Sequence, residues 1–154
     1  MNKKTISTIL LIIFLITIVL TLANVFLQDT NTSQNQTGTL TIDNKTVHYE
    51  KAGKCLEVID GNTIQIYGVG RVQLIQIGSP DKEPQISQAK NFVSDKCLGK
   101  TVYLDIDDEN PKDRYDRTLA IVYTEDCDIN KELLDNNLAK ISYFTPSEFK
   151  KGEV

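Results

Sequence analysis

Apolar and polar positions divide the chain into three stretches of different character. Residues 6–27 are almost continuously apolar and carry no charged side chain. Residues 28–38 are rich in Asn, Gln, Thr and Ser, which is typical of a polar linker. From residue 39 onward, apolar residues recur at the spacings of strands and helices. The pattern predicts an apolar N-terminal helix, a linker and one folded domain.

The first stretch is long enough to cross a bilayer, since about 20 apolar residues span its hydrocarbon core as a helix. Lys3 and Lys4 precede it and Asp29 follows it. By the positive-inside rule, residues 1–5 form a cytoplasmic tail, residues 6–27 span the membrane once, and the rest is extracytoplasmic. A signal peptide cleaved near Ala23 is the alternative, although its apolar region is usually shorter.

Alternation of apolar and polar residues predicts the strands of the first half. A possible extra hairpin lies at the end of the linker segment, 28–50, with strands 39–42 and 46–49. A three-stranded meander follows, with strands 55–59, 63–67 and 71–77. The turns between the meander strands contain Asp60-Gly61-Asn62 and Gly68-Val69-Gly70.

The second half of the chain alternates between helices and strands. One apolar face predicts a helix over 86–98 that packs on the barrel through Phe92 and Val93. Strands are expected at 101–106 and 118–123, a helix at 130–137, and a short last helix after the capping-box pattern at Thr145. The order predicts a mainly β (α+β) domain over residues 51–154, built on a five-stranded OB-type barrel with two to three short helices.

Charge and cysteine usage narrow the function. Lys and Arg number 17 against 21 Asp and Glu, a net charge of −4. This argues mildly against a strong nucleic-acid binder, although a local basic site would suffice. The three cysteines form no CxxC motif and His48 is the single histidine, so no zinc site is expected. An acidic run at 105–109 is typical of a solvated surface, with a weak relocated cation site as the alternative.

Five short motifs occur in one order between residues 58 and 141. They are VIDGNTI (58–64), QLIQIGSPD (73–81), DRYDRTLA (113–120), INKELL (129–134) and LAKI (138–141). Together they resemble the staphylococcal-nuclease (thermonuclease) family, and the resemblance covers residues 55–143. It implies an OB-type barrel that hydrolyses phosphodiesters with one calcium ion. Most of the family's long C-terminal helix has no counterpart here.

The resemblance also implies roles for single positions, and several are substituted. The two calcium-binding aspartates of the family correspond to Asn62 and Gly78, and the carbonyl ligand corresponds to Ser79, while Asp60 lies adjacent to the site. The family's glutamate becomes Asp81 and its first arginine becomes Gln73.

The second arginine of the family is kept as Arg117, with Tyr115 beside it and Thr63 near the turn. These positions predict what remains of a phosphate site. Arg71 lies on the same strand face as Gln73 and is the candidate replacement for the missing arginine. Each of these residues also has an ordinary structural explanation: a turn residue, a strand residue or a salt-bridged surface residue.

Two functions follow from these substitutions. The favoured one is a membrane-anchored, extracytoplasmic thermonuclease-like module that binds a partner, binds nucleic acid weakly and has little calcium-dependent nuclease activity. The alternative is a functional membrane-anchored nuclease that cleaves DNA or RNA with altered cation use. No cofactor is expected, with Ca²⁺ required if the domain is active.

An extracytoplasmic location would also allow a disulfide. In the fold that the resemblance implies, the ends of the two helices come close, which predicts a Cys97–Cys127 bond with Cys55 buried and free. Three buried thiols, or a bond that uses Cys55, are the alternatives.

Overall fold

The structure is a computed structural model that describes residue 6, residues 12–19 and residues 37–151. The chain divides into two compact units, Met1–Thr32 and Ser33–Val154. In the first unit, residues 12–19 form a helix with exposed apolar side chains. Within the described residues, no helix has the length and apolar character needed to cross a membrane. The predicted membrane helix, 6–27, lies largely outside them, as do residues 1–5 and 28–36.

The second unit begins with the predicted hairpin. Strands β1 (Gly38–Ile42) and β2 (Lys45–Tyr49) pair antiparallel around Asp43 and Asn44, whose φ angles are 50° and 61°. Two positive φ angles suit a tight hairpin turn, and Asp and Asn tolerate them better than most residues. Ile42 packs in one cluster with residues of the barrel, so the hairpin is part of the folded unit.

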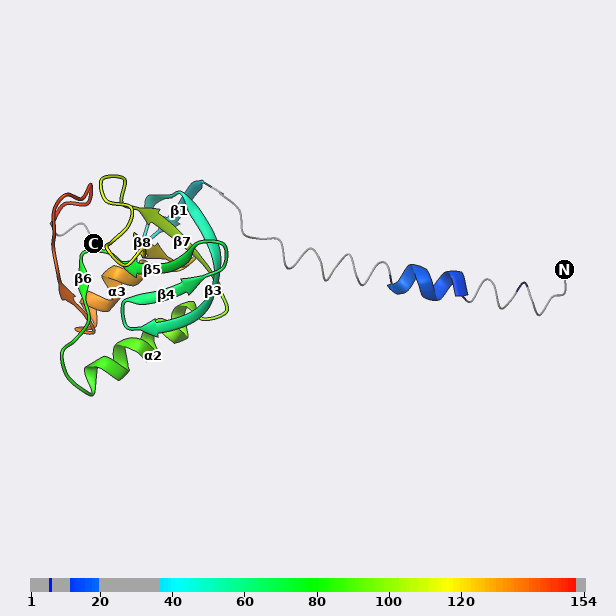
Figure 1. Ribbon diagram of the computed structural model, residues 1–154, viewed down its shortest axis with the longest axis horizontal. Coiled ribbons are helices and arrows are strands. Elements are labelled where there is room, and N and C mark those ends of the chain that lie inside the picture. The colour runs from blue at the N-terminus through cyan, green and yellow to red at the C-terminus, as the bar shows by residue number, and fades with distance from the viewer. Residues whose placement is uncertain (1–5, 7–11, 20–36, 152–154) are drawn as a thin grey trace. The chain divides into compact units, whose positions relative to one another are not determined.

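Five strands close the barrel that the sequence predicts (Figure 1). They are β3 (Lys51–Asp60), β4 (Thr63–Ile66), β5 (Gly70–Leu74), β7 (Thr101–Ile106) and β8 (Thr118–Tyr123). Their order around the barrel is β3-β4-β5-β8-β7. The pair β5 and β8 is parallel and the other neighbours are antiparallel.

The third meander strand differs from its prediction. Instead of running over 71–77, it ends at Leu74, and Gln76 adopts a φ of 60°. The buried Gln76 side chain explains the break, because it donates to Phe144 O (3.4 Å) and accepts from Phe144 N (3.1 Å). The chain then forms β6 (Ile77–Gly78), which pairs with β9 (Lys140–Ile141).

The two helices lie close to their predicted positions. Helix α2 (Gln85–Cys97) packs against β3 and buries Ala89, Val93 and Cys97, while Phe92 contacts the same core. A Cβ on Gly61 would lie 2.6 Å from Ala89 Cβ, so the turn after β3 needs glycine for α2 to approach. Helix α3 (Ile129–Asp135) starts at Asp128, whose side chain accepts from Lys131 N as an N-cap.

The predicted short helix after Thr145 is absent, since residues 145–151 form bends and turns. Glu148 does not act as a capping-box acid. Its N–H donates to Asp107 Oδ1 (3.2 Å), and its Oε1 accepts from Asp108 N (2.7 Å). Phe149 is buried with Ile75, Leu119 and Ile121, and this anchor favours the irregular path.

The predicted Cys97–Cys127 disulfide is also not formed, because Cys55, Cys97 and Cys127 are all free and buried. The three side chains belong to the main apolar cluster, and Cys127 Sγ lies 3.3 Å from Thr124 Oγ1. Burial raises the pKa of Cys97 to about 12, and the neighbouring Cys55 and Cys127 add to the effect. These thiols therefore pack as small apolar groups.

Candidate functional site

A pocket of about 730 Å³ lies beside β5, between the loop that leads into β8 and the segment after β9. Its lining includes Lys112, Arg114 and Arg117, with Asp113 as the one carboxylate, together with Gln73 and Tyr115. Lys112 pairs with Asp116 outside the lining and Arg117 pairs with Asp113, so the loop carries three cations against two acids and is locally basic on a chain of net negative charge. The pocket can therefore attract an anion.

Asp113 organises the loop that carries Arg117. Its Oδ1 accepts from Tyr115 N (2.8 Å) and Arg117 N (3.0 Å), and its Oδ2 accepts from Arg117 Nε (2.7 Å) and lies 2.6 Å from Nη2. Burial by itself raises the pKa of Asp113, but hydrogen bonds from Arg117 and Tyr115 outweigh it, so the pKa is lowered overall. Asp116, with a φ of 62°, closes the turn by donating its N–H to Asp113 O (3.0 Å).

Arg117 is fixed by two further contacts. Its Nη1 donates to Thr63 Oγ1 (3.4 Å), and its guanidinium carbon lies 5.4 Å from the centre of the Tyr115 ring. About a quarter of the side chain stays exposed (25%), so the guanidinium can still meet a ligand in the pocket. A held guanidinium suits phosphate recognition, but it has no lone pair to accept a proton and cannot activate water.

Gln73 lies opposite Thr63 on β4 and Leu119 on β8. Its Oε1 is buried and has no hydrogen-bond partner among the described residues. A buried acceptor without a partner costs free energy. The position that resembles the family's first arginine is therefore occupied by a neutral side chain with one unsatisfied atom.

The positions that resemble the calcium ligands do not fit calcium. Asn62 is buried, with Nδ2 donating to Ile77 O (3.3 Å) and Oδ1 accepting from Thr63 Oγ1 (3.4 Å). Asp60 Oδ1 accepts from Asn62 N (2.9 Å), which stabilises the turn. Gly78 has no side chain and Ser79 could offer a carbonyl. Calcium prefers charged carboxylates, and the described residues gather no group of metal-ligating side chains here.

Two predicted site residues lie away from the Arg117 pocket. Asp81 forms an exposed ion pair with Lys140 of β9 and lines a second pocket, of about 460 Å³. Arg71 is exposed on β5 and is not part of the pocket lining. The structure thus brings together Arg117, Tyr115 and Gln73, with Thr63 in contact with Arg117. The other predicted site residues do not line the pocket: Asp60, Asn62, Arg71, Ser79 and Asp81.

Sequence reasoning missed three contributors to the pocket: Asp113 as the partner of Arg117, and the cations Lys112 and Arg114. The spacing of Asp113 and Arg117, four residues apart, was a signal for the ion pair. Asp116, although adjacent to Arg117 in sequence, pairs with Lys112 at 2.5 Å. The turn at Asp116 positions the side chains of residues 112–117 so that Asp113 pairs with Arg117 and Asp116 pairs with Lys112.

Known proteins resemble this chain over much of the barrel. A family model described as "Staphylococcal nuclease homologue" matches residues 71–153. A thermonuclease of Staphylococcus intermedius is 36% identical over 101 residues, which cover 59% of this chain and 60% of that protein. A thermonuclease of Staphylococcus hyicus is 30% identical over 108 residues, covering 64% and 63% respectively.

A protein of Haemophilus influenzae named as an uncharacterized endonuclease is 33% identical over 91 residues, which cover 56% of this chain and 49% of that protein. The chain therefore spans between about half and two thirds of the length of these relatives.

Proposed function

Because this chain belongs to the staphylococcal nuclease family, we propose that its Arg117 pocket binds a phosphate of nucleic acid while calcium-dependent hydrolysis is slow. One observation carries the proposal. Arg117 is held by Asp113 and Thr63 inside a pocket that also contains Lys112 and Arg114. A charge-assisted hydrogen bond from a preorganised guanidinium is among the stronger contacts that a phosphate can gain.

Slow hydrolysis follows from what surrounds this arginine. Cleavage of a phosphodiester needs an activated water and stabilisation of the developing charge, and loss of one preorganised donor typically costs about 10²–10³ in rate. Gln73, Asn62 and Gly78 are uncharged, and Asp81 is paired with Lys140. The proposed role is therefore a binding module whose natural partner presents phosphate groups.

The second candidate is a working nuclease that uses a different cation. The names of the relatives, two thermonucleases and an uncharacterized endonuclease, favour it, as does the retained Arg117. Brisk hydrolysis that EDTA abolishes would support this candidate, and Asp60, Asp81 and Asp116 would then be the first carboxylates to replace.

We also propose that residues 6–27 anchor the domain to a membrane with the N-terminus in the cytoplasm. The support is the uncharged apolar run with Lys3 and Lys4 on one side. The test is alkaline extraction of membranes from cells that express the full chain, combined with protease added from outside. Retention in the pellet with external cleavage of the domain is expected, and full release into the supernatant would contradict the proposal.

Binding is tested with a labelled single-stranded oligonucleotide and the full chain in detergent, by fluorescence anisotropy at low salt. Arg117→Ala should weaken binding about tenfold or more, since hydrogen bonds to charged groups contribute about 1.5–3 kcal/mol. Arg71→Ala removes the same charge from the same barrel outside the pocket, and it should change affinity by less than about twofold.

The comparison of these two arginine variants decides between a site and a general charge effect. Circular dichroism first establishes that both variants are folded. Equal losses in the two variants would mean that net charge alone holds the oligonucleotide, and the proposed pocket would be rejected. Absence of binding by the unmodified chain at low salt would reject it as well.

A further inference from the structure

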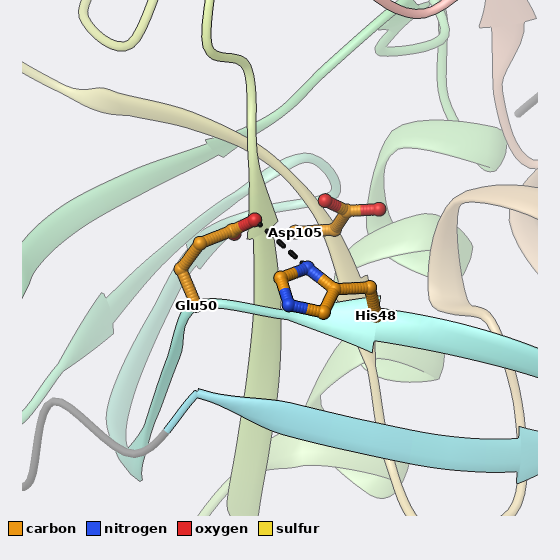
Figure 2. Close-up of side chains that lie close together, drawn as sticks. All are labelled: His48, Glu50 and Asp105. Atoms are coloured by element: carbon orange, nitrogen blue, oxygen red, sulfur yellow. Dashed lines mark hydrogen bonds and ion pairs between the residues drawn. The ribbon is translucent and has the colours of Figure 1, made fainter.

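Three side chains from two distant parts of the sequence come together where β2 lies against β7. His48 belongs to β2, Glu50 follows that strand, and Asp105 belongs to β7 (Figure 2). His48 Nδ1 lies 3.1 Å from Glu50 Oε1, and one ligand atom from each of the three residues lies within 4.8 Å of the other two. Figure 2 shows the Glu50 carboxylate directed at the imidazole ring and the Asp105 side chain close beside them.

The backbone holds Glu50 in a set position. Its N–H donates to Leu104 O (2.9 Å), and its Oε2 accepts from Ile106 N (2.7 Å). One carboxylate oxygen is thus fixed by β7 while the other faces His48. Outer contacts of this kind orient metal ligands and restrict their motion.

We propose that His48, Glu50 and Asp105 form a binding site for a first-row divalent transition-metal ion such as Zn²⁺, with water completing the coordination. Imidazole nitrogen and carboxylate oxygen are ordinary zinc ligands at about 2.0–2.2 Å, which places tetrahedral donors about 3.3 Å apart. The contact between His48 and Glu50 already has this spacing. The third donor, an Asp105 carboxylate oxygen, lies within 4.8 Å of the other two and would turn toward the ion on binding.

Charge at the cluster favours a cation. Glu50 and Asp105 place carboxylate oxygens within 4.8 Å of each other and of a ring nitrogen of His48. Two carboxylates are therefore crowded around one imidazole. A bound divalent ion would offset the repulsion between these carboxylates.

The cluster is open enough to load. The His48 side chain is 53% exposed and that of Glu50 is 30% exposed, so an ion can enter from solvent and keep water ligands. His48 and Glu50 precede the region that the family model matches, residues 71–153. None of the three residues is a position that resembles a calcium ligand, and His48 belongs to the β1–β2 hairpin of this chain.

The experiment uses the full chain in detergent, purified through a tag without histidine and stripped with EDTA. Zn²⁺ is titrated by calorimetry, and Co²⁺ is titrated by visible absorption. One ion per chain is expected. The single histidine gives one set of imidazole signals in NMR spectra, which should shift on addition of Zn²⁺.

Variants identify the ligands. His48→Gln and Asp105→Asn should each weaken Zn²⁺ binding by at least about tenfold to a hundredfold, the cost of losing even an outer partner of a ligand. Asp135→Asn is the matched control, because Asp135 is an exposed acid on α3 that pairs with Lys131 at 2.6 Å. Its Zn²⁺ affinity should stay unchanged.

Each contrary outcome overturns the proposal. No binding up to about millimolar Zn²⁺ would mean that the three side chains form an ion-pair cluster without metal. Equal weakening in all three variants would indicate diffuse charge attraction. A thiolate-to-cobalt absorption band, with unchanged His48 signals, would place the ion at a cysteine instead.

Discussion

The Arg117 pocket and the His48–Glu50–Asp105 cluster are charged regions of opposite sign in one folded unit. In the pocket, cations outnumber the single carboxylate of the lining. The positions that resemble the calcium ligands, Asn62 and Gly78, are uncharged. In the cluster, oxygens of two carboxylates lie within 4.8 Å of a nitrogen of one imidazole. The candidate metal ligands of this barrel therefore lie in the His48–Glu50–Asp105 cluster and not at the positions that resemble the calcium ligands.

The way each carboxylate is used sharpens the comparison. Asp113 uses both oxygens, one for two backbone N–H groups and one for Arg117. Glu50 uses one oxygen for Ile106 N and directs the other at His48. An acid with both oxygens occupied shapes a loop and holds an arginine, whereas an acid with one oxygen available can also bind a cation.

The largest expected effect comes from restoring charge to the pocket region. Asn62→Asp with Gly78→Asp should create measurable calcium affinity, and adding Gln73→Arg and Asp81→Glu should raise DNA hydrolysis by at least about 10². A Cβ on Gly78 would lie 3.4 Å from Ser142 Cβ, an ordinary contact, so an aspartate fits there. Calorimetry and a fluorogenic DNA substrate measure the two gains.

The same set of substitutions includes its own control. The variant with Gln73→Arg and Asp81→Glu alone should gain no calcium dependence, because it lacks the carboxylates at residues 62 and 78. Calcium-stimulated hydrolysis in that variant would show that calcium binds elsewhere, and it would weaken the contrast between the two regions.

A smaller effect is expected from Asp113→Asn. The amide keeps one acceptor for the backbone but loses the ion pair with Arg117, so the free energy of unfolding should fall by about 1–2 kcal/mol at neutral pH. Urea denaturation measures it. Asn110→Asp places a different substitution in the lining of the same pocket and should change stability by less than about 0.5 kcal/mol.

The loss in the Asp113 variant should depend on pH. Because the native pKa of Asp113 is lowered, its stabilisation is complete above the ordinary value of 3.8 and disappears as the pH falls through the lowered native value. The difference between the variant and the unmodified chain should therefore shrink in strong acid. A difference that grows in acid would contradict this role.

Asp105→Asn should raise, rather than lower, the free energy of unfolding of the metal-free protein. Burial and the neighbouring Glu50 raise the native pKa of Asp105 from 3.8 to about 7. Ionised Asp105 therefore lowers the stability of the native protein at pH values above 7, and this loss disappears toward pH 4. With allowance for partial exposure, the variant should be more stable by about 0.5–1 kcal/mol at pH 8 in EDTA. Excess Zn²⁺ should reverse the order, which thermal denaturation can follow.

The smallest effect is expected at the surface pair of Lys140 and Asp81. Both side chains are mostly exposed, so Lys140→Ala should change the free energy of unfolding by less than about 0.5 kcal/mol. It should also leave the rate of DNA hydrolysis unchanged. A marked gain in activity would mean that Lys140 blocks a competent Asp81, and the slow-hydrolysis proposal would need revision.

Local patterns predicted most of the fold because turns, alternation and helical spacing are properties of neighbouring residues. The β1–β2 hairpin, α2 and the five barrel strands follow from them. Two segments did not. The break at Gln76 depends on Phe144, and the path near Glu148 depends on Asp107 and Asp108. Those contacts join residues far apart in sequence, which no local pattern encodes.

The candidate site likewise combines features that the sequence predicted with features that only the folded chain shows. The position of Arg117 beside Tyr115 was available from a contiguous motif, and the structure places both in the pocket. The exclusion of Arg71 and the pairing of Asp81 with Lys140 required the closed barrel and the β6–β9 pair. The His48 cluster joins β2 to β7 across more than fifty residues, so the sequence indicated no metal site there.

Hydrolysis of single-stranded DNA by the unmodified full chain, titrated with Ca²⁺ and then with EDTA, tests the central claim most directly. The claim is that the phosphate pocket persists without a calcium site. The account predicts a low rate that neither Ca²⁺ nor EDTA changes, at least about 10² below that of the fourfold variant. A brisk rate that rises with Ca²⁺ and falls with EDTA would contradict it.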